Sequence, residues 1–175
     1  MDTRSQTWPY EIACEAGPLC VRSHGPGDMG WVLHRHAVLY HREHGFDLSF
    51  DTYVLNGLRE FAEEYDPSTD RLWIAESDGC PVGSIALLAS GGKAAQLRWF
   101  LVEPEFRRLG VGRILLDVAL EFAKGHFDRV FLWTLLHLDA ARGLYVSRGF
   151  TSTEVKTHGI WGRTLTEERM DWVNS

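Results

Sequence analysis

The chain has 175 residues, of which 45% are hydrophobic and 24% are charged, and its formal net charge is −6. Its seven tryptophans and nine phenylalanines argue against disorder, and the length suits one globular domain with a full core. The acidic balance disfavours a broad nucleic-acid-binding surface, and no apolar run approaches the roughly 18 residues that suggest a membrane span.

The N-terminal segment and the cysteines indicate the compartment. The first 17 residues contain neither a basic n-region nor an apolar h-region, so we expect no secretory signal. Cys14, Cys20 and Cys80 are sparse and odd in number, which favours free thiols in a reducing environment over a disulfide framework. We therefore expect a cytoplasmic protein without a nucleic-acid or membrane partner.

Residues 1–18 are of mixed polarity with an early proline, and we expect them to form an N-terminal arm. Residues 19–175 are expected to form a single domain. Asp78 and Gly79 favour a tight hairpin turn between two short apolar runs in its first half. The elements predicted in that half are a strand at 19–23, helices at 29–44 (N-cap Asp28, C-cap Gly45) and 49–65, and strands at 71–77, 81–90 and 95–104.

The second half begins with a regular amphipathic helix over 112–123, whose apolar residues recur at steps of three and four. The run RVFLWTL at 129–135 is almost wholly apolar, and we expect a strand buried on both faces. The last predicted elements are a helix at 139–149 and strands at 150–157 and 164–173. The order β-α-α-β-β-β-α-β-α-β-β indicates an α+β fold, an α/β sandwich in form.

Gly110 and Gly112 stand at the start of the amphipathic helix, although glycine is a poor helix former. The first N–H groups of a helix have no intrahelical partner and carry a partial positive charge, and glycine lets a ligand approach them. Arg107, Arg108 and Arg113 add positive charge. The stretch therefore favours an anion cradle for a phosphate or pyrophosphate, while a purely structural glycine turn remains the alternative.

Two familiar phosphate-binding motifs do not fit this stretch. No G-x-x-x-x-G-K-[ST] sequence is present, and Leu115 stands where a dinucleotide fingerprint needs its third glycine. Residues 107–112, RRLGVG, instead resemble R/Q-x-x-G-x-G/A, the acyl-CoA pyrophosphate loop of the GNAT family of N-acyltransferases. Residues 140–150, AARGLYVSRGF, are similar to the second CoA-side motif of that family, A-x-x-x-Y-x-x-x-G-F.

The resemblance extends over about residues 19–173 and implies the GNAT fold. That fold has a mixed, mostly antiparallel sheet of about seven strands, flanked by about four helices. Its sheet is splayed between the fourth and fifth strands, here about 95–103 and 129–135. The resemblance implies acetyl-CoA, or another acyl-CoA, as co-substrate.

A narrower likeness concerns residues 25–47 and the late segment THGIWG. Both resemble a bacterial group in which the acyltransferase domain often follows a MarR-type helix-turn-helix domain. About 18 residues precede the first predicted strand, so we expect no such DNA-binding domain in this chain.

The family resemblance also implies roles for single residues. Backbone N–H groups near Leu101 and Val102 would bind the pantetheine arm and polarise the thioester carbonyl. Tyr145 would be the general acid that protonates the leaving thiolate, with a core tyrosine as the alternative. The cofactor-binding residues implied are Leu101, Val102, Arg107, Arg108, Leu109, Gly110, Val111, Gly112, Arg113, Ala141 and Tyr145.

The sequence names no unique general base. The candidates are Glu103, His137, Asp139 and His158, and for each a solvated or structural role remains open. Leu138 stands where many family members have an asparagine, which puts any contact carried over at that position in doubt. The acceptor site is expected to include His34, Tyr40, His41 and Trp161.

The histidines at 34–44 also raise a metal-binding alternative, but no H-E-x-x-H motif or carboxylate triad completes a site, so we expect no metal. No cysteine has a histidine partner suggested by the sequence, which favours direct attack by the amine in a ternary complex.

The leading hypothesis is an N-acetyltransferase acting on a primary amine, with a small-molecule or peptide amine as acceptor. The acidic net charge favours a cationic acceptor. The alternative is a non-catalytic acyl-CoA-binding sensor or interaction module of the same fold. A homodimer involving Trp161, Trp172 and the final strand is a further expectation from the family.

Overall fold

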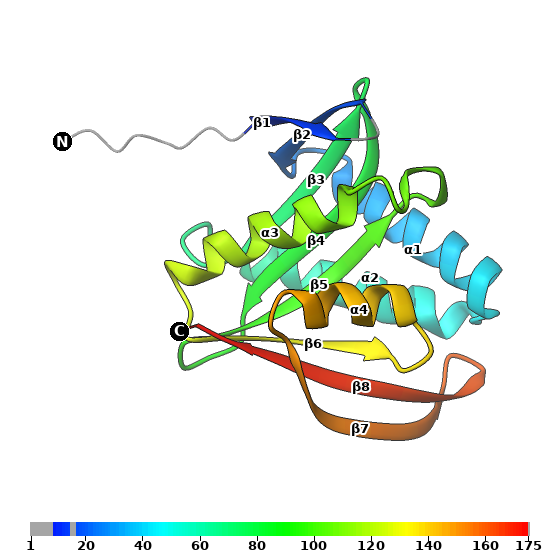
Figure 1. Cartoon of the computed structure of the whole chain (residues 1–175). Coiled ribbons are helices and arrows are strands. Elements are labelled where there is room, and N and C mark those ends of the chain that lie inside the picture. Colours follow the sequence, from blue (N-terminus) through cyan, green and yellow to red (C-terminus); the bar gives the residue numbers. More distant parts are fainter. Residues whose placement is uncertain (1–8, 15–16, 175) are drawn as a thin grey trace.

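The computed structural model describes residues 9–14 and 17–174, which build one eight-stranded sheet with helices on both faces (Figure 1). The strand order is β1-β2-β3-β4-β5-β6-β8-β7. The elements are β1 Pro9–Cys14, β2 Gly17–Ser23, α1 Asp28–His44, α2 Leu48–Glu64, β3 Arg71–Ser77, β4 Cys80–Ala89, β5 Ala94–Val102, the 3₁₀ turn η1 Pro104–Phe106, α3 Val111–Lys124, β6 Arg129–Leu135, α4 Asp139–Ser147, β7 Thr151–Ile160 and β8 Arg163–Val173.

The α+β architecture and the element order expected from the sequence are confirmed. The sheet has one strand more than expected. This strand is β1, which lies inside the segment expected to be an N-terminal arm and pairs antiparallel with β2 from Pro9↔Arg22 to Cys14↔Gly17. Its backbone therefore extends the sheet at the edge opposite β7.

The splay expected in the middle of the sheet is also confirmed. Among the neighbouring strands that the structure describes, only β5 and β6 run parallel. They pair only from Ala94↔Arg129 to Gln96↔Phe131. Beyond Gln96 no residue of β5 pairs with β6, although β5 continues to Val102. Backbone groups on that side of β5 are thus left for a partner other than the neighbouring strand.

Two apolar layers hold the helices to the sheet. On the face that carries α3 and α4, Leu115, Leu116 and Ala119 pack with sheet residues such as Trp73 and Leu87. Helices α1 and α2 cover the other face (Figure 1), where the apolar side chains come from both helices and from β3. The buried residues of this second layer include Val32, Val54, Leu58, Leu72 and Ile74.

Each buried aliphatic side chain of these layers stabilises the fold by about 1.5–3 kcal/mol. In the part of the chain that the structure covers, no helix combines the length and the apolar character needed to cross a membrane.

A β-bulge lies in β5 next to the splay. Ser84 pairs with Leu101 and Ala86 pairs with Arg98, so Ile85 stands opposite two residues, Trp99 and Phe100. Trp99 has a φ of 46°, and its carbonyl accepts a hydrogen bond of 2.7 Å from the Ser84 hydroxyl. A bulge interrupts the strict alternation of side chains, so consecutive residues can face the same side of the sheet.

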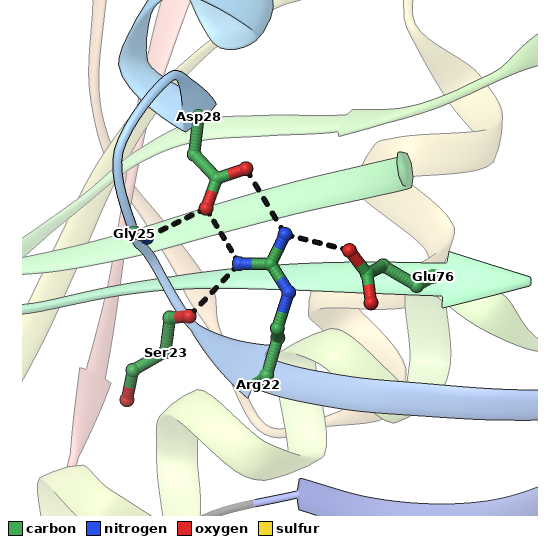
Figure 2. Close-up of polar contacts among 5 residues, drawn as sticks. All are labelled: Arg22, Ser23, Gly25, Asp28 and Glu76. Atoms are coloured by element: carbon green, nitrogen blue, oxygen red, sulfur yellow. Dashed lines mark hydrogen bonds and ion pairs between the residues drawn. The ribbon is translucent and has the colours of Figure 1, made fainter. Parts of the chain in front are cut away.

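The start of α1 is fixed by an ion-pair cluster that joins it to two strands (Figure 2). Arg22 of β2 donates hydrogen bonds to Asp28 and to Glu76 of β3, and the Gly25 N–H donates to the Asp28 carboxylate at 2.6 Å. The predicted N-cap role of Asp28 is therefore wrong. Gly27 occupies that position with a φ of 92°, while the Asp28 carboxylate turns back toward Arg22.

Candidate active site

A cavity of about 760 Å³ opens where β5 and β6 diverge. Residues 96–102 of β5 and 132–135 of β6 form its two sheet walls. The start of α3 and the side of α4 close it on one face of the sheet, and residues of α1 and α2 close it on the other. The cavity thus passes through the sheet and is bordered by all four helices.

The turn before α3 presents unpaired backbone donors to this cavity. Gly110 is the N-cap of α3 with a φ of 89°, a conformation that strains other residues, and no side chain caps the helix there. The exposed arginines Arg108 and Arg113 lie beside it and also line the cavity. Open N–H groups, a helix N-terminus and two cations together suit a bound polyanion.

All the expected cofactor-binding residues line the cavity except Leu109 and Val111. The Val111 side chain is only 1% exposed and packs in the core beneath α3. Arg107 is held in place by its own chain. Its guanidinium donates to the Glu43 carboxylate at 2.8 and 3.1 Å, and its Nε donates to the Val102 carbonyl at 3.0 Å.

Tyr145 projects from α4 into the same cavity and is 5% exposed. Its ring packs against Phe100 and Phe150, with centroids 6.0 and 5.7 Å away. No described residue forms a hydrogen bond with its hydroxyl. Burial, with a smaller contribution from Tyr40, raises the pKa of Tyr145 well above its usual value. The hydroxyl is therefore protonated at neutral pH and able to donate to a ligand.

Two histidines from distant parts of the chain meet at the cavity. The Nε2 atom of His137, in the turn after β6, lies 3.4 Å from Nδ1 of His44 at the end of α1. Burial, followed by the proximity of His137, lowers the pKa of His44 below its usual value. His44 is therefore mostly neutral at pH 7, while His137 is exposed and connects the pair to solvent.

The other expected base candidates differ in their positions. Asp139 lines the cavity, but its side chain is 93% exposed. Glu103 is absent from the lining residues and receives two hydrogen bonds from Arg35 of α1, of 2.5 and 2.6 Å. His158 also lies outside the lining, although its partner Glu167, 2.6 Å away, belongs to it.

Of the expected acceptor residues, Tyr40 and Trp161 line the cavity. Trp161 begins the two-residue turn between β7 and β8, and its ring packs on Phe50 and Tyr53 with centroids 4.9 and 5.2 Å away. His34 and His41 are exposed and are not lining residues. The Nδ1 atom of His41 lies 2.8 Å from the Phe46 carbonyl, beyond the end of α1.

Sequence reasoning missed two charged residues of this cavity, Arg98 and Glu167. Arg98 lies in the otherwise apolar run LRWFLV, and a charged residue inside such a run is the sequence signal that could have identified it as a functional residue. Glu167 lies in the charged part of β8, where nothing in the sequence distinguishes it from its neighbour Glu168. Buried Glu168 pairs with Arg142 instead, with Nε to oxygen at 2.5 Å.

The sequence profile of the Acetyltransferase (GNAT) family matches residues 33–150. The chain is similar to N-acetyltransferase family 8 member 3 of Rattus norvegicus, with 42% identity over 87 residues that cover 46% of this chain and 38% of that protein. It spans only 38% to 44% of the length of the curated relatives that it matches.

Solved structures share the fold. The structure of yncA from Salmonella typhimurium with its cofactor acetyl-CoA has a TM-score of 0.70 at 20% identity, over 90% of this chain and 94% of that one. Arabidopsis thaliana NAA60 in complex with a bisubstrate analogue has a TM-score of 0.63 at 16% identity, over 90% and 99% of the two chains.

Proposed function

The chain belongs to the GNAT acetyltransferase family, and from this premise we propose that it transfers an acetyl group from acetyl-CoA to a primary amine. The observation that carries the proposal is the cavity through the splayed sheet, which joins an uncapped helix N-terminus to a buried tyrosine hydroxyl. The acetyl-CoA bound to yncA and the bisubstrate analogue bound to NAA60, both proteins of this fold, support a donor and an acceptor held together.

In this proposal the turn before α3 holds the donor. The N–H groups around Gly110 and Gly112 bind the pyrophosphate, with Arg108 and Arg113 as additional cations. The edge of β5 near Leu101 and Val102, which does not pair with β6, offers backbone N–H groups to the pantetheine amide and the thioester carbonyl, while the Val102 carbonyl is already bonded to Arg107. Ala141 provides part of the wall on the α4 side. Acetyl-CoA is a co-substrate here, and no metal takes part.

The reaction is a direct displacement. The amine nitrogen attacks the acetyl carbonyl carbon, the C–N bond forms, and the C–S bond breaks as the thiolate leaves. Tyr145 donates its phenolic proton to that thiolate. The apolar surroundings that raise the pKa of Tyr145 make its phenol a weaker acid, but they also disfavour a charged thiolate, and this second effect favours the protonated thiol as product. The phenolate left on Tyr145 then regains a proton from solvent before the next turnover.

A proton must leave the attacking amine, and we propose that the His44–His137 pair takes up this proton. Neutral His44 faces the cavity and exposed His137 passes the proton to solvent. Glu103 is engaged by Arg35 and His158 by Glu167, so these groups suit structural roles better. Asp139 remains a weaker alternative at the mouth.

The decisive experiment measures CoA release from acetyl-CoA in the presence of primary-amine pools, with the melting temperature recorded alongside. We expect acetyl-CoA to raise the melting temperature and amines to stimulate CoA release. Binding without release from any amine favours the alternative, a non-catalytic acyl-CoA sensor. The absence of both effects contradicts the enzyme and the sensor together.

Tyr145→Phe tests the general acid. Loss of the hydroxyl should lower kcat roughly a hundredfold, the usual worth of a positioned acid, and leave the acetyl-CoA affinity nearly unchanged. Tyr53→Phe is a control that removes a half-exposed hydroxyl from the same cavity. Unchanged turnover in Tyr145→Phe removes the tyrosine from the mechanism.

Two family-level expectations remain proposals beside this function. Membership of the bacterial group related to MarR-fused acyltransferases rests on the segment at 25–47 and the segment THGIWG, which spans the end of β7 and the turn after it. Homodimerisation through Trp161, Trp172 and β8 is testable by light scattering with purified protein. Localisation in the cytoplasm likewise stays a prediction.

A further inference from the structure

Three arginines of the cavity have no ion-pair partner among the described residues: Arg98, Arg108 and Arg113. Arg108 and Arg113 flank the turn before α3, where the donor pyrophosphate accounts for them. Arg98 belongs to β5, before the bulge. This third guanidinium has no part in binding the donor.

The alternation of side chains along β5 explains why Arg98 points toward α2. Before the bulge, Ala95 and Leu97 belong to the apolar layer beneath α3, so Gln96 and Arg98 alternate to the opposite side. At the bulge the alternation breaks, and Trp99 also joins the layer beneath α1 and α2. Consecutive residues, a guanidinium and an indole, thus face the same part of the cavity.

The guanidinium of Arg98 is held in position by its neighbours. Its central carbon lies 5.6 Å from the Tyr53 ring centroid and 5.0 Å from that of Trp99. It also rests against Gly57 of α2, where an added Cβ would come 2.6 Å from Nη2. A glycine inside a helix costs about 1 kcal/mol relative to alanine, and here it makes room for the arginine.

Among the residues that the structure describes, the cavity offers Arg98 no counter-ion of its own. Its lining carboxylates are Glu43, Asp139 and Glu167. Glu43 is bonded to Arg107, Glu167 lies against His158, and Asp139 lies 3.8 Å from Arg142. A partly buried, oriented guanidinium without a carboxylate partner is suited to bind one bidentately from a ligand.

We propose that the acceptor is a small primary amine that carries a carboxylate near the amino group, and that Arg98 binds this carboxylate. The proposal rests on the transferase function above and names its substrate class. Phe50, Tyr53 and Trp161 line the same side of the cavity, so the acceptor also carries an apolar or aromatic side chain. The local charge thus points to a different acceptor from the cationic one that the net charge favours.

A matched set of three acceptors tests the carboxylate. Phenylalanine, phenylalaninamide and phenethylamine share the primary amine and the ring, but only the first has a carboxylate. With saturating acetyl-CoA, we expect kcat/KM for phenylalanine to exceed that for the other two by roughly ten- to a hundredfold. A charge-assisted pair of hydrogen bonds strengthens binding by about this factor.

Two variants test whether Arg98 is the anchor. Arg98→Met keeps an apolar stem of similar length, and the preference for phenylalanine over phenethylamine should collapse to within about threefold, because the carboxylate loses its bidentate partner. Gly57→Ala keeps the arginine but displaces its guanidinium, so KM for phenylalanine should rise while the melting temperature holds or increases. Arg59→Met, on the exposed side of α2, is the charge-matched control and should keep the preference.

The outcomes separate this proposal from the proposed function. If acetyl-CoA binds and amines are acetylated without preference for the carboxylate, or if Arg98→Met retains the preference, the anchor is contradicted and the transferase stands. Acetylation of none of the three amines by a protein that binds acetyl-CoA also contradicts the anchor. If acetyl-CoA neither binds nor releases CoA with any amine, the proposed function itself is contradicted.

Discussion

Single residues at the mouth of the cavity allow the proposed transfer mechanism to be tested. His44 and His137 lie 93 positions apart in the chain, yet their ring nitrogens approach to 3.4 Å. Burial and the second ring lower the pKa of His44, so the imidazole is free to accept a proton at neutral pH. As the pH falls through this lowered pKa, His44 becomes protonated and loses its capacity as a base.

We predict that His44→Gln lowers kcat/KM by roughly ten- to a hundredfold and removes the acidic limb of the pH–rate profile, because the proton acceptor is lost. The measurement is kcat/KM between pH 5 and 9. His34→Gln, on the exposed side of the same helix, is the control and should behave like the wild type. A His44→Gln profile identical to that of the wild type would show that another group accepts the proton.

Gly110 gives a second residue-scale prediction. Gly110→Asp places a carboxylate at the mouth of the anion site, and we expect KM for acetyl-CoA to rise more than about tenfold through like-charge repulsion. Gly91→Asp is a matched control, because both glycines have a positive φ (89° and 78°) and no atoms within 4 Å of an added Cβ. Gly91 is not a cavity residue, so its variant reports backbone strain alone. Equal effects on KM in both variants would remove Gly110 from the donor site.

The helices and strands fix the positions of the cavity residues. Helix α1 carries Glu43 and His44 at its last turn, and its first turn is tied to the sheet through Asp28. The Asp28 side chain is only 8% exposed. Burial alone would raise the pKa of Asp28, but hydrogen bonds from Arg22 and the Gly25 N–H outweigh it and lower the pKa. The ionised carboxylate therefore depends on Arg22.

We predict that Arg22→Met lowers the free energy of unfolding by about 2–4 kcal/mol, because Asp28 is left buried without its counter-ion. Urea unfolding at pH 7 measures the change. Arg59→Met, which breaks only an exposed pair with Glu63, should lower it by less than about 1 kcal/mol. If the two variants are equally stable, the cluster in Figure 2 does not hold α1 to the sheet.

Strand β6 shows that an apolar sequence pattern can overstate how deeply a strand is buried. Its apolar run predicted a strand buried on both faces, and that prediction was wrong for Phe131 and Trp133, which are only partly buried. Arg169 and Lys156 cover their rings, with 4.1 and 4.5 Å from the cation to the ring centroid. The apolar run therefore identified the strand correctly. It did not show that one face would be covered by the side chains of Arg169 and Lys156 and not by an apolar layer.

At the scale of the whole molecule, the two-layered packing buries a titratable group that forms no ion pair within the described part of the chain. His36 of α1 is 4% exposed, its Nδ1 lies 2.8 Å from the Val32 carbonyl, and burial lowers its pKa to about 4. The unfolded chain has a histidine pKa near 6.5, so it takes up the proton first as the pH falls. Stability from this residue is complete above pH 6.5 and is lost between about pH 6.5 and 4.

We predict that His36→Phe flattens the pH dependence of unfolding, because the His36 contribution amounts to about 2 kcal/mol between pH 8 and pH 5. Unfolding free energies of variant and wild type at these two values give the difference. His126, an exposed histidine at the end of α3, supplies the control variant His126→Phe. A wild-type slope retained in His36→Phe would show that other groups govern acid sensitivity.

The sequence alone determined the order of the elements, the turn before α3 and the tyrosine helix. Each is encoded within a few neighbouring residues. Glycines with positive φ mark turns, a three-and-four spacing marks α3, and the loop and tyrosine motifs are short and contiguous. The family and its fold followed from these local signals.

The tertiary structure decided which side chains meet. The pairing of Glu103 with Arg35, of Arg107 with Glu43 and of His44 with His137 joins residues more than 60 positions apart. Such contacts depend on strand register and on how helices cross the sheet, neither of which a local pattern contains. The bulge that turns Trp99 to the same side as Arg98 is the clearest case, because one extra residue in β5 reverses the side that alternation assigns to the residues after it.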